Sequence, residues 1–81
     1  MNYDLAMRAL EGLARERIEV AREGDEIRIS GGAAAFRELA RLCLLLGQDD
    51  TASGESLTLD PGVHATAESA RITLQRSGQP S

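Results

Sequence analysis

The stretch RIEVAREGDEIRIS constrains the fold more than any other part of this sequence. Ile18 and Val20 alternate with polar residues in its first half, and two further isoleucines do the same in its second half. Two short alternating runs around a Gly-Asp pair are typical of an antiparallel hairpin with one apolar face. The sequence therefore predicts strands over residues 17–22 and 26–30.

A helix over residues 33–46 is predicted directly after this hairpin. Its apolar residues recur at helical spacing and its charged residues fall on the other side. The pair Gly31-Gly32 precedes it. A phosphate-binding turn is one interpretation of this pair, but no lysine follows and the spacing fits neither nucleotide-binding pattern. We interpret the pair as a hinge. The expected stripe consists of Phe36, Leu39, Ala40, Cys43 and Leu46.

Patterns elsewhere complete an α+β fold. Residues 3–15 have helical periodicity, whereas SLTLD and ARITLQR alternate like strands. We expect one domain over residues 1–81: an N-terminal helix (1–16), a ββαββ core (17–76) and a frayed tail (77–81). The expected core is one four-stranded antiparallel sheet with the main helix on its apolar face. That face would carry Ile18, Val20, Ile27, Ile29, Leu57, Leu59, Ile72 and Leu74.

The leucines of the two helices need a partner that this sheet does not provide. Either the helices pack together within one chain, which we favour, or the leucines form a contact between two copies. The set consists of Leu5, Leu10, Leu13, Leu42 and Leu45.

Composition argues against several classes of function. The net charge of −4 is unfavourable for nucleic acid, whose phosphates need a basic surface. The apolar run LCLLLG is too short to cross a membrane, and no secretory signal is visible. A single cysteine fits a reducing compartment. We therefore expect a cytoplasmic protein that contacts neither nucleic acid nor membrane.

No residue pattern predicts an enzyme, a metal centre or a cofactor site. His64 has no neighbouring ligand, so we interpret it as an exposed residue without function. Cys43 falls in the apolar stripe and is expected to be a small buried residue. Asp49 and Asp50 match no calcium-binding loop.

An acidic surface is the main candidate for binding a partner. In a single sheet, the first hairpin turn and the loop after the main helix would share one end. Their carboxylates would then form a local negative field, which attracts basic proteins. The candidate residues are Glu23, Asp25, Glu26, Asp49, Asp50 and Glu55. The second choice is the polar sheet face around Arg28, Arg71, Thr73 and Gln75.

The motifs GDEIRISG before the helix and LTLDPG after it resemble the family-thirty-two immunity proteins of bacterial polymorphic toxin systems. The resemblance covers residues from 17 to about 76, and it implies an α+β fold and neutralisation of a toxin. We therefore expect an immunity protein that blocks a cognate basic toxin non-covalently through the acidic surface. The alternative is a small homodimeric structural or regulatory module without a toxin partner.

Overall fold

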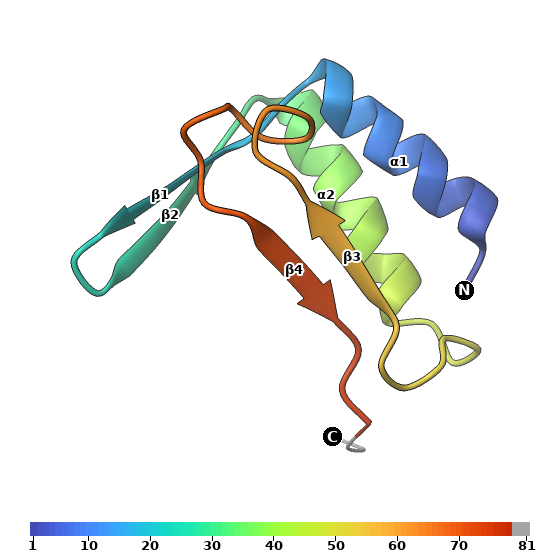
Figure 1. Cartoon of the computed structure of the whole chain (residues 1–81). Helices are drawn as coiled ribbons and strands as arrows, with labels where there is room; N and C mark the ends of the chain where they lie inside the picture. The colour runs from blue at the N-terminus through green and yellow to red at the C-terminus, as the bar shows by residue number, and fades with distance from the viewer. Residues whose placement is uncertain (79–81) are drawn as a thin grey trace.

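The computed structural model describes residues 1–78 and has an α+β fold. The helix-then-ββαββ order is the predicted one, while residues 79–81 of the expected frayed tail lie outside the described part (Figure 1). The elements are α1 (Tyr3–Arg15), β1 (Glu19–Glu23), β2 (Glu26–Ser30), α2 (Ala33–Leu46), β3 (Ser56–Leu59) and β4 (Ile72–Gln75).

Helices α1 and α2 pack side by side within the chain (Figure 1). The Asn2 side chain caps α1, because its Oδ1 accepts a hydrogen bond from the N–H of Leu5 at 3.1 Å. Leu13 and Leu42 are completely buried, and Leu45 is nearly so. Of the leucines expected at a contact between copies, only Leu5 is classed as exposed. The set could therefore join two copies only if the two helices separated.

The strands form two separate two-stranded antiparallel sheets, so the prediction of one four-stranded sheet is wrong. In the first sheet β1 pairs with β2, and Val20 lies opposite Ile29. In the second sheet β3 pairs with β4, and Leu57 lies opposite Leu74. Gly24 takes a φ of +60° in the first hairpin turn, which glycine adopts without strain.

The connection between β3 and β4 explains why the two sheets do not merge. Ile18 N–H donates to the His64 carbonyl at 3.1 Å, and Thr66 N–H donates back to the Ile18 carbonyl at 2.9 Å. Further along, the Ser69 hydroxyl accepts from the N–H of Val20 at 2.9 Å. The edge of β1 that would have paired with another strand is therefore bonded to this irregular segment.

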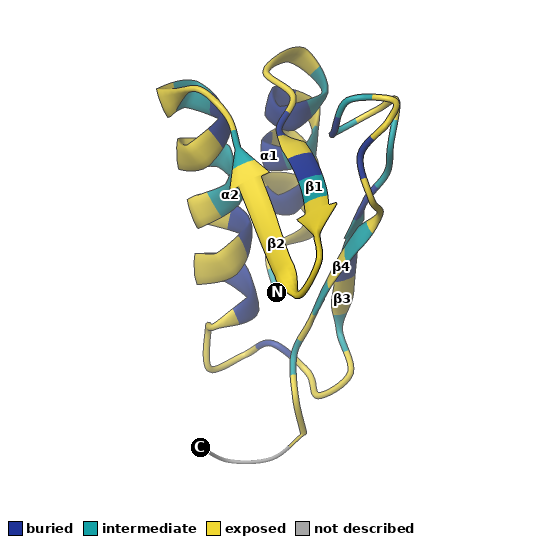
Figure 2. Cartoon of the chain, turned by 90° about the vertical axis from the view of Figure 1, so that its left-hand side faces the viewer, coloured by how far each residue is buried: buried dark blue, intermediate teal, exposed yellow. Residues whose placement is uncertain are grey.

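The hydrophobic core lies between the helices, the start of β1 and the β3–β4 sheet (Figure 2). The expected sheet face is buried at Ile18, Val20, Leu57 and Leu59, and half-buried at the two apolar residues of β4. Ile27 and Ile29 are instead exposed, because their hairpin projects from the body and no helix covers it (Figures 1 and 2).

Helix α2 is rotated relative to the expected stripe. Its buried residues are Ala35, Leu42, Leu45 and Leu46. The Phe36 side chain, expected in the core, is 42% exposed. Packing against α1 as well as the sheet turned the buried face away from the stripe that a sheet alone would select.

The glycine pair before α2 joins strand to helix as predicted, but for a different physical reason. Neither glycine takes a positive φ. A Cβ on Gly31 would lie 3.2 Å from the Cβ of Ala35 and 3.3 Å from Cγ2 of Ile18. Gly31 therefore allows the backbone to approach the core closely. Gly32 is the N-cap residue of α2.

Candidate functional site

The two acidic segments do not share one end of the molecule. The β1–β2 turn, which carries Glu23, Asp25 and Glu26, projects on one side (Figure 1). The loop of residues 47–55 lies on the far side, beyond the end of α2 (Figure 1). The expected cluster of six carboxylates is therefore divided, because it depended on a single four-stranded sheet.

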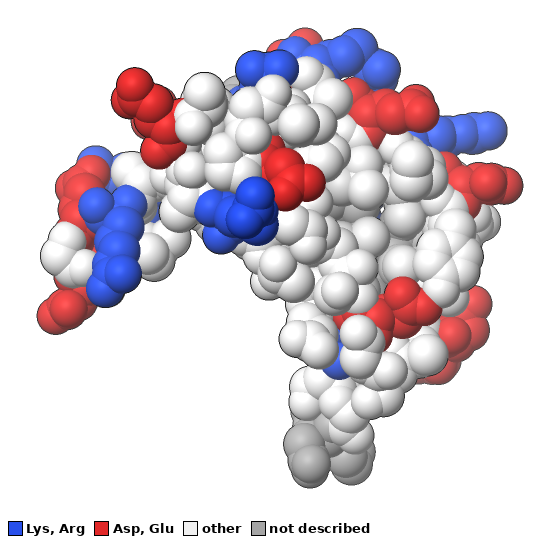
Figure 3. Space-filling view, in the orientation of Figure 1, with Lys and Arg blue, Asp and Glu red and all other residues white. Residues whose placement is uncertain are grey.

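A neighbouring arginine offsets part of the negative charge at the hairpin tip. Arg28 donates to Oε1 of Glu23 at 3.0 Å and to Oε2 of Glu26 at 3.1 Å. Both pairs are solvent-exposed, and the tip shows red and blue side chains together (Figure 3). The tip is consequently less negative than its count of acidic residues implies.

The second segment gathers its charge at the start of α1. We call Asp49, Asp50 and Glu55 the acidic loop. The N-terminal ammonium of Met1 lies 3.8 Å from Oδ2 of Asp50. The Tyr3 hydroxyl donates a hydrogen bond to Oε1 of Glu55. That bond, and the negative charge of the carboxylate, raise the pKa of the Tyr3 hydroxyl above its usual 10.0.

Hydrogen bonds from both sides hold the acidic loop in place. The Thr51 hydroxyl donates to the Leu45 carbonyl at 2.6 Å. The guanidinium of Arg76, just beyond β4, donates to the carbonyls of Leu46 at 2.6 Å and Gln48 at 3.0 Å. These bonds satisfy carbonyls at the C-terminal end of α2 and place a positive charge at its negative pole. The loop is thus fixed relative to both helices.

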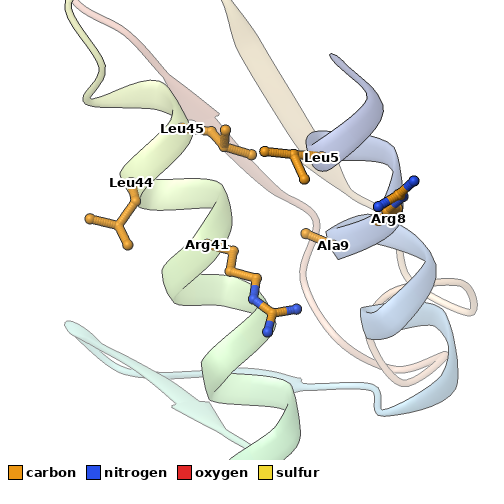
Figure 4. Close-up of a pocket in the computed structure, with 6 residues that line it drawn as sticks. All are labelled: Leu5, Arg8, Ala9, Arg41, Leu44 and Leu45. Carbon is orange, nitrogen blue, oxygen red and sulfur yellow. The ribbon is translucent and has the colours of Figure 1, made fainter. Parts of the chain in front are cut away.

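An apolar groove lies between α1 and α2 and includes residues of the last turn of α2 (Figure 4). It has a volume of about 360 Å³. Leu44 on its edge is 71% exposed, and Leu5 opposite is 45% exposed. Exposed apolar side chains beside charged ones are common at protein-binding surfaces. We call this surface the helix groove; it is lined by Leu5, Arg8, Ala9, Arg41, Leu44 and Leu45.

The second-choice surface is also divided. Arg28 belongs to the projecting hairpin, whereas the other three residues belong to β4 or adjoin it. Arg71 pairs with Asp60 at 3.0 Å. The hydroxyl of Thr73 lies 3.2 Å from that of Thr58. Gln75 lies opposite Ser56. Arg71, Thr73 and Gln75 therefore form a polar strip along β4 that does not include Arg28.

Residues considered for chemistry have structural or unassigned roles. His64 is half-buried, and its Nδ1 accepts from the N–H of Asp60 at 3.1 Å, so it closes a turn rather than standing free. Cys43 is exposed, which corrects the expectation of a buried thiol. Among residues 1–78, no group of three or more His, Cys, Asp or Glu side chains could hold a metal ion. In the same part of the chain, neither helix has the length and apolar character to span a membrane.

The helix groove was missed by the sequence reasoning, although a signal was present. Leu44 lies outside the apolar stripe and outside the set of leucines expected to join the helices. This unplaced leucine, beside Leu5 and Leu45 of that set, could have indicated an exposed surface shared by the two helices. Comparison with known proteins adds no likeness, because no protein-family model, curated protein or solved structure matches this chain.

Proposed function

We propose that this protein is a non-enzymatic immunity protein that binds and neutralises a basic bacterial toxin. The contact surface consists of the acidic loop together with the helix groove. One observation carries the proposal. Tyr3, which is 59% exposed, is hydrogen-bonded to Glu55 of the acidic loop, and Leu5, two residues further along α1, lines the helix groove.

This arrangement supplies the parts that a protein interface needs. Aromatic side chains and fully desolvated apolar contacts supply most of the binding energy in interfaces, and charged rims add mainly to association rate. Tyr3, Leu5 and Leu44 are the apolar anchors. Asp49 and Asp50 stand at the rim, and Asp49 is exposed.

The acidic loop suits a toxin that acts on nucleic acid. Such an enzyme carries a basic cleft for phosphate groups, and carboxylates placed there would occupy the same positions. Because the loop is held by Thr51 and Arg76, it meets a partner with little loss of conformational freedom.

The experiment compares two variants with the same change of charge. Asp49→Asn/Asp50→Asn removes two negative charges from the acidic loop, and Asp25→Asn/Glu26→Gln removes two from the hairpin tip. The partner is the product of the reading frame upstream of this gene. We expect the loop variant to associate roughly tenfold more slowly at low salt, with the difference lost as salt screens the charges. The tip variant should associate like the wild type.

Two outcomes would contradict the proposal. Equal slowing by both variants would mean that only the overall charge matters. Slowing by the tip variant alone would place the contact on the hairpin. A third variant, Leu44→Ser, tests the groove, because loss of an apolar anchor should speed dissociation and leave association nearly unchanged.

A further inference from the structure

The outer edge of β2 is an unpaired strand edge. In the described part of the chain, β2 pairs with β1 alone, and Glu23 lies opposite Glu26 across a two-residue turn. In such a hairpin the pair next to the turn is hydrogen-bonded, and the bonding direction alternates along the strand. The backbone groups of Ile27 and Ile29 therefore point away from β1.

The same alternation holds on β1, where the outward groups have partners. Ile18 and Val20 point away from β2, and both bond to the segment before β4. On β2 the outward groups of Ile27 and Ile29 have no backbone partner among residues 1–78. Edge strands of this kind readily pair with another strand.

The two isoleucines of β2 lie on one face of the hairpin together with Val20 and Arg22, and the charged residues of β2 lie on the other. Ile29 shares a face with its partner Val20, which is buried, so this face turns toward the body. Ile27 lies on the same face and is 54% exposed. Glu26 and Arg28 lie on the opposite, outward face, where they pair with each other at 3.1 Å.

One flank of α2 is apolar and open on the hairpin side. Its residues enclose a shallow hollow of about 470 Å³. At 100° per residue they lie away from Glu38 and Arg41, which face α1. Figure 2 is viewed from this side, and β2 lies in front of α2 there. Figure 3 shows a concave surface below the hairpin. The flank consists of Phe36, Leu39, Ala40, Cys43 and Leu44.

We propose that a second copy of this chain pairs its β2 with β2 of the first, antiparallel, around a two-fold axis at Ile27. In this register the outward backbone groups of Ile27 bond to those of Ile27 in the second copy. Glu26 then faces Arg28 of the second copy, and Arg28 faces its Glu26. The charge pattern of the strand is thus complementary to itself.

This occupant fits the strand for reasons that an unrelated partner does not share. A two-fold contact requires a surface that matches its own copy, and Glu-Ile-Arg centred on Ile27 does so. Only the part of the hairpin near Ile18 and Val20 is bonded to the body, and pairing would extend it into a four-stranded sheet. The added strands would extend over the α2 flank and cover its apolar side chains. The acidic loop lies elsewhere and stays free, and the helix groove shares only Leu44 with the covered flank.

The first experiment uses two single charge reversals. Glu26→Arg places Arg opposite Arg in its own dimer, and Arg28→Glu places Glu opposite Glu. Each variant alone should dimerise at least about tenfold more weakly than the wild type in sedimentation equilibrium, because like charges oppose each other across the strands. An equimolar mixture should recover a heterodimer, since both cross-strand pairs are then opposite in charge. Damage to the hairpin within one chain could not be repaired by mixing.

The second experiment fixes the register by disulfide formation. In a Cys43→Ala background, Ile27→Cys should cross-link two copies on mild oxidation, because Cα atoms of a hydrogen-bonded pair are about 5.5 Å apart. Ile29→Cys in the same background is the control and should stay uncross-linked. Three outcomes would overturn the proposal: a monomeric wild type at all concentrations, a mixture that remains monomeric, or cross-linking at residue 29 alone.

Discussion

Gly12 of α1 lies directly against the side chain of Glu38 on α2, so that a Cβ at residue 12 would overlap the Glu38 carboxylate. Glycine inside a helix costs about 1 kcal/mol relative to alanine. Here the missing side chain lets the two helices approach each other at a buried position. Glu38 is in turn held by Arg41 at 2.6 Å, so it cannot move aside without losing that pair.

This contact predicts that Gly12→Ala changes the free energy of unfolding in opposite directions depending on whether Glu38 is present. In the wild type we expect the substitution to destabilise the fold by about 1 kcal/mol, because the overlap outweighs the gain in helix propensity. In a Glu38→Ala background it should stabilise the fold by roughly 0.5–1 kcal/mol. Urea unfolding of the four proteins in this cycle measures both values. Stabilisation by Gly12→Ala in both backgrounds would show that Glu38 does not restrict residue 12.

The rotated face of α2 predicts very different costs for two large apolar residues. Leu42→Ala should lower the free energy of unfolding by about 2–5 kcal/mol, because Leu42 is fully buried. Phe36→Ala should cost about 1 kcal/mol or less, because its side chain is half-exposed. Thermal melts at low protein concentration, where copies stay separate, compare the two variants. A larger loss of stability for Phe36→Ala than for Leu42→Ala would contradict the rotated face and favour the stripe expected from the sequence.

Local signals predicted the elements well, and non-local packing limited the rest. Alternation and helical spacing located the hairpin and both helices, since these depend on residues close in sequence. Whether the two hairpins would join into one sheet depended on the bonds of Ser69 to Val20 and of His64 to Ile18, which occupy the free edge of β1. No pattern within the polar segment around them indicates those bonds. The acidic residues were expected to lie together because a single sheet would have brought their two loops to one end, and the two separate sheets keep those loops apart.

Tyr3 provides a direct measurement at the candidate site. It is the only tyrosine and there is no tryptophan, so its ionisation can be followed by near-ultraviolet absorbance. We expect it to ionise above pH 10.0, and Glu55→Gln to bring its pKa back toward that value, because the hydrogen bond to a carboxylate and then the negative charge are removed. Arg28→Gln, on the distant hairpin, is the control. An unchanged Tyr3 pKa in Glu55→Gln would argue against the hydrogen bond.

The raised pKa of Tyr3 also predicts the direction in which stability changes with pH. A pKa that is higher in the folded state favours the neutral hydroxyl there. The contribution of the Tyr3–Glu55 bond is therefore complete below the unfolded pKa of 10.0 and is lost as pH rises through the folded pKa. Unfolding curves of wild type and Tyr3→Phe should differ near neutral pH and converge in strong alkali.

Arg76 predicts how firmly the acidic loop is held. Its guanidinium bonds the carbonyls of Leu46 and Gln48, so Arg76→Met leaves the end of α2 without these donors. We expect a loss of about 1–3 kcal/mol in the free energy of unfolding. Amide hydrogen exchange should also quicken in residues 47–55. Arg71→Met is the matched control, because the Arg71–Asp60 pair is exposed and should contribute about 1 kcal/mol or less. Equal losses in the two variants, with unchanged exchange in the loop, would show that Arg76 does not anchor it.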